Sequence, residues 1–186
     1  MRIDAAPDVR RSRVDEVARA ASHIALMTAE PHDGAAIDRF MRELSRESRR
    51  SRFFVSMDDS ALAAEMVREL RPAANTVSVV ARDRASGLIV GHAIAIGDER
   101  GVSEVALAVA DAYHNHGIGT LLLERVMAQA ALRGARAFEA EILPDNRSML
   151  DIFARAGYEL IRRPGDNAVH AQALSTPPPR ARAASG

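Results

Sequence analysis

The sequence has 186 residues, which is long enough for one well-cored domain but too short for two ordinary ones, so we expect one site. The 25 Lys and Arg residues balance the 25 Asp and Glu residues and aromatic residues make up only 4%, which argues against a nucleic-acid-binding protein or one drawn to an anionic membrane. The absence of cysteine excludes a disulfide framework, a thiolate zinc site and a cysteine nucleophile, and it favours a reducing compartment, the cytoplasm. No apolar run approaches the roughly 18–20 residues that span a bilayer, and the charged start does not resemble a signal peptide, so we expect a soluble protein.

Two polar segments flank the expected domain. Residues 1–20 are charged and only weakly periodic, which predicts an N-terminal extension. Residues 175–186 contain Pro177, Pro178 and Pro179 among small and basic residues, and this composition predicts a disordered tail. The single domain therefore covers residues 21–174.

Helical and extended patterns alternate within this domain. The apolar run 23–28 predicts a strand, and Asp33 is placed to cap a helix whose apolar positions recur at helical spacing as far as Leu44. Asp58 or Asp59 is placed to begin a second helix, which Pro72 would stop.

The central part of the chain has the period of strands. Residues 76–81 and 88–96 are β-branched or apolar, and the intervening segment 83–87 predicts a hairpin turn. Residues 102–110 predict a further strand.

The pattern returns to helical after Gly119, and the next helix is expected to end near Gly134. Residues 138–143 predict a strand, Asn146 or Asp145 caps a helix that runs to about Ala156, and residues 158–161 and 169–174 predict the last two strands. This order of elements indicates an α+β fold, a mixed sheet with helices on its faces.

The segment 105–123 joins a strand to a helix through a turn that contains Gly117 and Gly119. Backbone N–H groups in the first turn of a helix lack internal partners, and glycine allows a ligand to approach them, so this turn is a candidate phosphate site. No Gly-Lys-Ser/Thr follows, which excludes a Walker P-loop, and Leu122 occupies the third glycine position of a dinucleotide fingerprint. On these residues alone, a plain flexible connection stays open.

Two histidines flank Asn115 in this turn, at His114 and His116. Adjacent side chains in a turn rarely converge on one ion, and no carboxylate is spaced to complete a ligand set. We therefore expect no metal.

The strand, the Gly-x-Gly turn, the helix and the following strand, together with Asn146, Phe153 and the Gly157-Tyr158 pair, resemble the central half of a GNAT acyltransferase. The resemblance covers residues 21–174. Segments 39–54 and 103–113 are similar, more narrowly, to bacterial protein lysine acetyltransferases, some of which are fused to cyclic-nucleotide-binding or acyl-CoA-synthetase-like domains that this chain has no room for. The resemblance implies a mostly antiparallel central sheet that is splayed in the middle and has helices on both faces.

The resemblance also implies acetyl-CoA as the cosubstrate. Main-chain groups of one strand would pair with the pantetheine arm, backbone N–H groups of the turn would surround the pyrophosphate, and an asparagine would hydrogen-bond the pantetheine. In this sequence those positions are Leu107, Ala108, Val109, His114, Asn115, His116, Gly117, Ile118, Gly119, Thr120 and Asn146. The family's usual glutamine or arginine is replaced by His114 and its first glycine by Asn115, a residue that tolerates positive φ.

Glu104 matches the family's general base. A carboxylate there would accept the proton of an attacking amine, and we expect it to be buried beside Val102 and Val105, which would make it a stronger base. The tyrosine that protonates the departing thiolate in many relatives is replaced by Phe153.

Other polar and aromatic residues are expected to serve structure. His92 and His170 lie in predicted strands, and Tyr113 and Tyr158 fit packing positions. Arginines cluster at the end of the first helix, where they form a solvated helix end or else border the acceptor groove or the adenosine 3′-phosphate. They are Arg46, Arg49, Arg50 and Arg52.

These observations predict an N-acetyltransferase that moves an acetyl group from acetyl-CoA to a primary amine, which the narrower likeness makes a protein lysine. Two alternatives stay open: acetylation of a small amine, and a non-catalytic acyl-CoA-binding sensor. A homodimer that pairs through the final strand is a further expectation, because sheet edges are exposed.

Overall fold

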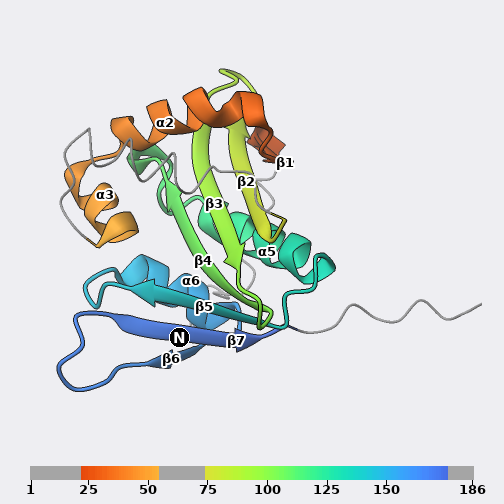
Figure 1. The fold of residues 1–186 in the computed structure, drawn as a ribbon. Helices are drawn as coiled ribbons and strands as arrows, with labels where there is room; N and C mark the ends of the chain where they lie inside the picture. Colours follow the sequence, from red (N-terminus) through yellow and green to blue (C-terminus); the bar gives the residue numbers. More distant parts are fainter. Residues whose placement is uncertain (1–21, 55–73, 176–186) are drawn as a thin grey trace, which may run out of the picture.

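The computed structural model describes residues 22–54 and 74–175 of the chain (Figure 1). The expected extension 1–20, the helix predicted to start at Asp58 or Asp59 and the tail after Ser175 lie outside the described residues.

Seven strands form one sheet in the order β1-β2-β3-β4-β5-β7-β6. They are β1 (Ile24–Thr28), β2 (Thr76–Asp83), β3 (Ile89–Gly97), β4 (Val102–Val109), β5 (Ala137–Ile142), β6 (Glu159–Ile161) and β7 (Val169–Leu174). All neighbouring strands are antiparallel except β4 and β5, which are parallel. The predicted mixed fold with a mostly antiparallel sheet is confirmed.

The turn between β2 and β3 forms where the sequence predicts it. Asp83 Oδ1 accepts hydrogen bonds from the backbone N–H groups of Ala85 and Ser86 at 3.0 and 2.7 Å. Gly87 then takes a φ of 71°, which side-chain-bearing residues rarely adopt. These local interactions fix the hairpin.

The sheet opens between β4 and β5. Only three residue pairs join these strands, Val102–Glu104 of β4 with residues 137–139 of β5, whereas β4 continues to Val109. On its other side β4 stays paired with β3 from Ser103 to Val109. Beyond Glu104 the two strands therefore diverge, and the sheet has the shape of a V (Figure 1).

Helices α5 (Ile118–Leu132) and α6 (Arg147–Arg155) cover one face of this sheet. Apolar side chains of α5 and Phe153 of α6 join strand side chains such as Val79 and Leu107 in the larger core cluster. Burial of these side chains supplies the main driving force for folding and fixes both helices against the diverging strands.

Helix α2 (Gly34–Glu43) covers the opposite face. Its residues Ile37, Phe40 and Met41 are buried against Val80 of β2 and Ala108 of β4 in a second core cluster. Figure 1 shows α2 lying across the ends of β2 and β3. Helices therefore cover both faces, as predicted.

The chain between Arg39 and Phe54 is not one helix. Leu44 leaves the helical conformation with ψ 145°, and Ser45 caps a separate helix, α3 (Arg46–Phe53), by accepting a hydrogen bond from the N–H of Ser48 at 3.1 Å. The break lets α3 turn toward the opening between β4 and β5 (Figure 1).

The final strand is not an exposed edge. All six residues of β7 pair with β5, and its other side pairs with β6, so the described sheet has its edges at β1 and β6. The expectation that two copies pair through the final strand as an open sheet edge is therefore wrong, because β6 covers residues 170–172 of that edge; the homodimer itself stays a prediction.

Candidate active site

The divergence of β4 and β5 exposes backbone groups of β4. The N–H of Ala110 donates to the carbonyl of Val90 on β3 at 2.8 Å. Because backbone groups alternate in direction along a strand, those of Ala108 also point toward β3, and those of Leu107 and Val109 point into the opening. Of the three strand residues predicted to pair with pantetheine, two therefore direct main-chain groups into the opening, and Ala108 does not.

The turn that follows β4 directs backbone N–H groups toward the same opening. Asn115 and Gly117 take φ angles of 61° and 76°, and the first helical hydrogen bond of α5 runs from Leu121 N to Gly117 O at 3.2 Å. The N–H groups of the first three residues of α5, residues 118–120, thus lie ahead of any intrahelical partner, at the positive end of the helix dipole. The turn has the geometry of an anion site.

Gly119 has a packing role in addition. A Cβ added there would lie 2.8 Å from Cδ1 of Ile152 on α6. Glycine therefore allows the start of α5 and the middle of α6 to approach each other beneath the opening.

His114 and His116 use their imidazole rings to hydrogen-bond carbonyl groups of the turn. The N–H of His114 donates to the carbonyl of Asp111 at 3.2 Å, and its Nε2 donates to the carbonyl of Val109 at 3.0 Å. The Nδ1 of His116 donates to the carbonyl of His114 at 2.8 Å. Both imidazoles thus hold the turn in shape, and the His114 ring covers one of the acceptor groups on the open edge of β4.

These elements enclose a cavity of about 820 Å³. It is lined by the predicted cofactor residues Leu107, Ala108, Val109, His114, Asn115, Gly117, Ile118, Gly119, Thr120 and Asn146. His116 and Glu104 are not among the lining residues. The structure therefore brings nearly all of the predicted cofactor residues to one cavity, although they are spread over some forty residues of sequence.

Asn146 reaches the cavity from the far side, at the start of α6. Its Oδ1 accepts a hydrogen bond from the N–H of Met149 at 3.1 Å, so it caps α6 as the sequence predicts. The amide nitrogen of the same side chain remains as a donor.

The sequence did not single out most of the lining contributed by α3 and α6. Among the clustered arginines, Arg50 and Arg52 line the cavity, whereas Arg46 and Arg49 are not among the lining residues. The other lining residues outside the predicted set are Glu47, Ser48, Ser51, Asp111, Tyr113, Asp145, Arg147, Ser148, Met149, Asp151, Ile152 and Arg155. The separate helix α3, which carries five of these residues and was not predicted, explains much of the difference.

Glu104 stands at the last residue pair that joins β4 to β5, where its Cα partner is Glu139. It lies on the same face as Ala108, about 13 Å along the strand from it. The Glu104 side chain is exposed, so the expected burial beside Val102 and Val105 is wrong. Because side chains alternate along β4, those of Glu104 and Val105 point to opposite faces, and only Val105 enters the core.

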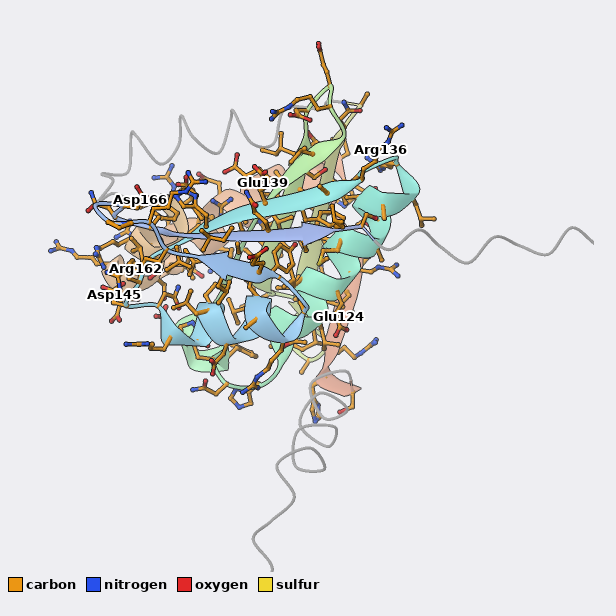
Figure 2. All side chains as sticks on the ribbon, turned by 90° about the horizontal axis from the view of Figure 1, so that it is seen from below. Glu124, Arg136, Glu139, Asp145, Arg162 and Asp166 are labelled. Carbon is orange, nitrogen blue, oxygen red and sulfur yellow. The ribbon has the colours of Figure 1, made fainter. Side chains whose placement is uncertain are left out.

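The neighbouring strand adds a second carboxylate at this point. Figure 2 shows Glu139 on the side of β5 away from α6. Its Oε1 accepts a hydrogen bond from Gln172 of β7 at 3.4 Å. Glu104, Glu139 and Gln172 therefore form a polar row across the sheet where the V begins.

The aromatic residues near the cavity have separate environments. Phe153 is buried and packs edge-on against Tyr158, with 4.7 Å between ring centroids. Burial raises the pKa of Tyr158. Tyr113 lines the cavity, and its hydroxyl donates to Asp83 at 3.4 Å. Phe153 offers no proton, so the acid of many relatives has no counterpart at this position.

Residues 22–54 and 74–175 contain neither a membrane-spanning helix nor a cluster of metal ligands. In these parts of the chain no helix has both the length and the apolarity needed to cross a membrane. Within the same residues no group of three or more His, Asp and Glu side chains is arranged to hold a metal ion.

A family model described as the acetyltransferase (GNAT) family matches residues 37–158, more than half of the chain. This match contains the open edge of β4, the glycine turn and α6.

Solved structures share the fold. The GNAT domain of S. lividans PAT is 26% identical, with a TM-score of 0.70 over 80% of this chain and 89% of that one. A phosphinothricin acetyltransferase from Sinorhizobium meliloti, solved in complex with AcCoA, is 19% identical, with a TM-score of 0.65 over 82% of this chain and 89% of that one. A cAMP-binding acyltransferase from Mycobacterium smegmatis is 24% identical, with a TM-score of 0.56, and the match covers 83% of this chain but 44% of that one.

Proposed function

The chain belongs to the GNAT family of acetyltransferases, which makes it an acyl-CoA-dependent N-acyltransferase, and we propose that it moves an acetyl group from acetyl-CoA to a protein lysine in the V-shaped opening between β4 and β5. The observation that carries this proposal is the single cavity that joins the open edge of β4, the first turn of α5 and Asn146.

In the proposed complex, the parts of acetyl-CoA would follow the cavity in order. The pyrophosphate would accept hydrogen bonds from the free N–H groups at the start of α5, where the helix dipole favours negative charge. The pantetheine arm would then run along β4 and pair with Leu107 and Val109 as an added strand does, while the amide of Asn146 donates to it from the other side. The thioester would point toward Glu104.

The reaction then needs one base and one group to stabilise negative charge. Glu104 accepts a proton from the acceptor's ammonium group directly or through water, and the neutral amine nitrogen then attacks the thioester carbonyl carbon and gives up its second proton to water. The N–H of Val109 or of Leu107 is free to stabilise the oxyanion before the carbon–sulfur bond breaks. The thiolate of coenzyme A is a good leaving group and takes its proton from water, since Phe153 supplies none.

A cationic acceptor fits the surroundings of Glu104. Glu104 and Glu139 are exposed and adjacent across the sheet, so their charges attract a protonated amine to the point where the strands diverge. The likeness of segments 39–54 and 103–113 to bacterial protein lysine acetyltransferases supports a protein lysine as that amine. We place the reaction in the cytoplasm, a compartment consistent with a cysteine-free chain.

The acceptor class is tested by incubating the protein with labelled acetyl-CoA and two sets of acceptors, lysine-containing proteins and small amines such as polyamines, amino acids and amine antibiotics. We expect label on protein lysines. Label confined to a small amine contradicts the lysine proposal and leaves the acyltransferase proposal intact.

A non-catalytic acyl-CoA sensor is the second candidate, and one observation favours it. The imidazole of His114 covers the Val109 carbonyl, and Phe153 replaces the family's acid, so binding could persist where turnover is poor. Tight binding of acetyl-CoA without thiol release on any acceptor would establish the sensor. The position of Glu104 beside the opening favours the enzyme.

A further inference from the structure

Helix α3 contacts the connections that follow both diverging strands, β4 and β5. It follows a sharp break at Leu44, and five of its eight residues line the cavity. The connection after β4 contacts its N-terminal end through Asp111, and the connection after β5 contacts its middle through Asp145. Helix α3 thus bridges the two connections that lead into the proposed cofactor site.

The first bridge is built on Asp111, directly after β4. Its Oδ2 accepts the N–H of Ser45 at 3.0 Å, and its Oδ1 accepts the hydroxyls of Ser45 and Ser48 at 2.6 and 2.8 Å. The Ser45 hydroxyl also accepts the N–H of Ser48, so its single proton is committed to Asp111. One carboxylate therefore holds the cap of α3 and the residue three positions further on.

Asp111 keeps its charge over the working pH range. Partial burial opposes ionisation, but the hydrogen bonds from Ser45 and Ser48 and the nearby His114 outweigh it and lower the pKa of Asp111 to about 2. Hydrogen bonds to an ionised acceptor are shorter and stronger than neutral ones, which suits an anchor.

The second bridge is weaker. Arg50 donates to Oδ2 of Asp145 at 3.0 Å, and their side chains are 46% and 66% exposed. Figure 2 shows Asp145 at the beginning of α6, next to the cap residue Asn146. Solvent and salt screen such exposed pairs, so this contact can open while the Asp111 anchor stays closed.

We propose that Asp111 is a positioning residue for acetyl-CoA binding: it fixes α3 at the mouth of the cofactor cavity, and the Arg50–Asp145 pair closes α3 onto the other arm. Asp111 touches none of the reacting atoms. Its loss lets α3 move away from the turn 114–120, which weakens cofactor binding and leaves the chemical step nearly unchanged. This inference rests on the proposed cofactor site.

The test is Asp111→Asn, measured by the affinity for acetyl-CoA and by the separate values of kcat and KM. The amide keeps the shape of the side chain but turns a donor toward the Ser45 N–H or the serine hydroxyls and removes the charge. We expect Kd and KM for acetyl-CoA to rise about tenfold, with kcat within about threefold of the wild type. Ser48→Ala should add little in the Asp111→Asn background, because both changes remove the same contact.

Asp98→Asn is the matched control. Asp98 accepts the N–H groups of Arg100 and Val102, each at 2.9 Å, and the Arg100 side chain at 2.7 Å, in the turn between β3 and β4, outside the residues that line the cofactor cavity. It therefore loses a comparable set of hydrogen bonds. A merely structural role for Asp111 predicts the same loss of thermal stability in both variants and an unchanged Kd for acetyl-CoA in both.

The affinity for acetyl-CoA decides whether Asp111 has this role. Tenfold weaker binding in Asp111→Asn alone supports the inference, and binding within twofold of the wild type overturns it. If Asp111→Asn does not fold, Ser48→Ala carries the test, since it removes one bond: a rise of about two- to threefold in Kd is expected, and no rise overturns the inference. A wild-type protein that fails to bind acetyl-CoA would instead contradict the proposed cofactor site.

Discussion

His92 is fully buried in the middle of β3, with its Nε2 2.8 Å from the hydroxyl of Ser78. Burial lowers its pKa to about 3, and the positive charge of Arg52 contributes in the same direction. The imidazole is therefore neutral at neutral pH, and the proposed mechanism gives it no role. His92 instead affects the free energy of unfolding.

That effect has a definite sign. Between pH 6.5 and about 3 the unfolded histidine binds a proton that the folded one does not, so stability falls as the pH is lowered through this window. We expect a loss of about 1.4 kcal/mol per pH unit from this group. Urea unfolding at neutral pH and at about pH 4.5 measures it, and the slope should be clearly shallower in His92→Gln. An equal slope in the variant would show that other groups cause the acid sensitivity.

The site residues show which details a sequence can predict. The family pattern points to Glu104 and the turn as candidate site residues, because the chemistry depends on residue type and order. It does not reveal that Glu104 is exposed, because burial depends on which sheet face α2 covers. Nor does it reveal that the His114 ring binds the Val109 carbonyl, because this contact depends on the exact path of the turn.

The glycine turn between β4 and α5 leads to a prediction about both stability and cofactor binding. Gly117 has a φ of 76°, so Gly117→Ala should cost about 1–2 kcal/mol of stability and should raise KM for acetyl-CoA by displacing the N–H groups of α5. Gly34→Ala is the control, because Gly34 is helical, at φ −52°, and an added Cβ meets no atom within 4 Å. Thermal unfolding and steady-state kinetics report the two effects. An unchanged KM in Gly117→Ala would argue against phosphate binding at this turn.

The cap of α6 supplies another prediction. Asn146→Ala removes the acceptor for the Met149 N–H and should cost about 1 kcal/mol, whereas Asn146→Asp keeps that acceptor and should retain stability. Both variants lose the amide donor proposed to contact pantetheine, so both should raise KM for acetyl-CoA. Denaturant unfolding and KM measured on the same preparations test this. If only the alanine variant changed KM, Asn146 would act through α6 alone.

Elements whose signals are local could be predicted from the sequence. The β2–β3 hairpin and α6 form at the expected residues, because Asp83, Gly87 and Asn146 carry their own turn and cap chemistry. Helix α3 was not expected as a separate element, because its local cap residue Ser45 directly follows a helical apolar period that runs to Leu44; Asp111, distant in sequence, then adds to this cap. The interior place of β7 likewise depends on pairing with β5 and β6, and no local pattern encodes it.

In the molecule as a whole, the parallel junction of β4 and β5 creates the opening that we propose as the active site. One crossover through α5 sets these strands parallel, and their three residue pairs hold the apex of the V. The antiparallel strands on either side of this junction, β1–β4 and β5–β7, pack against α5 and α6. The opening therefore lies between two well-packed parts of the sheet. A site built this way needs few side chains, since the backbone supplies most of its donors.

The composition of the whole chain leads to a prediction about self-modification. All 25 basic residues counted as Lys and Arg are arginine, so the sequence offers no lysine side chain to its own reaction. Prolonged incubation with acetyl-CoA should therefore add no acetyl group to any side-chain amine, which intact-mass and peptide mass spectrometry can check. Arg50→Lys, with its new amine at the cavity, is the positive control and should gain one acetyl group. Side-chain acetylation of the unaltered chain would contradict the prediction.

We propose that acyl transfer occurs in this opening with Glu104 as the base. The rate of free-thiol release from acetyl-CoA with a lysine acceptor, compared between the wild type and Glu104→Gln, tests this proposal when acetyl-CoA affinity is measured on both proteins. We predict a fall in kcat of about a hundredfold or more with an affinity within about twofold, because the amide cannot accept the proton and Glu104 lies outside the cofactor cavity. Equal turnover by the two proteins would contradict the claim.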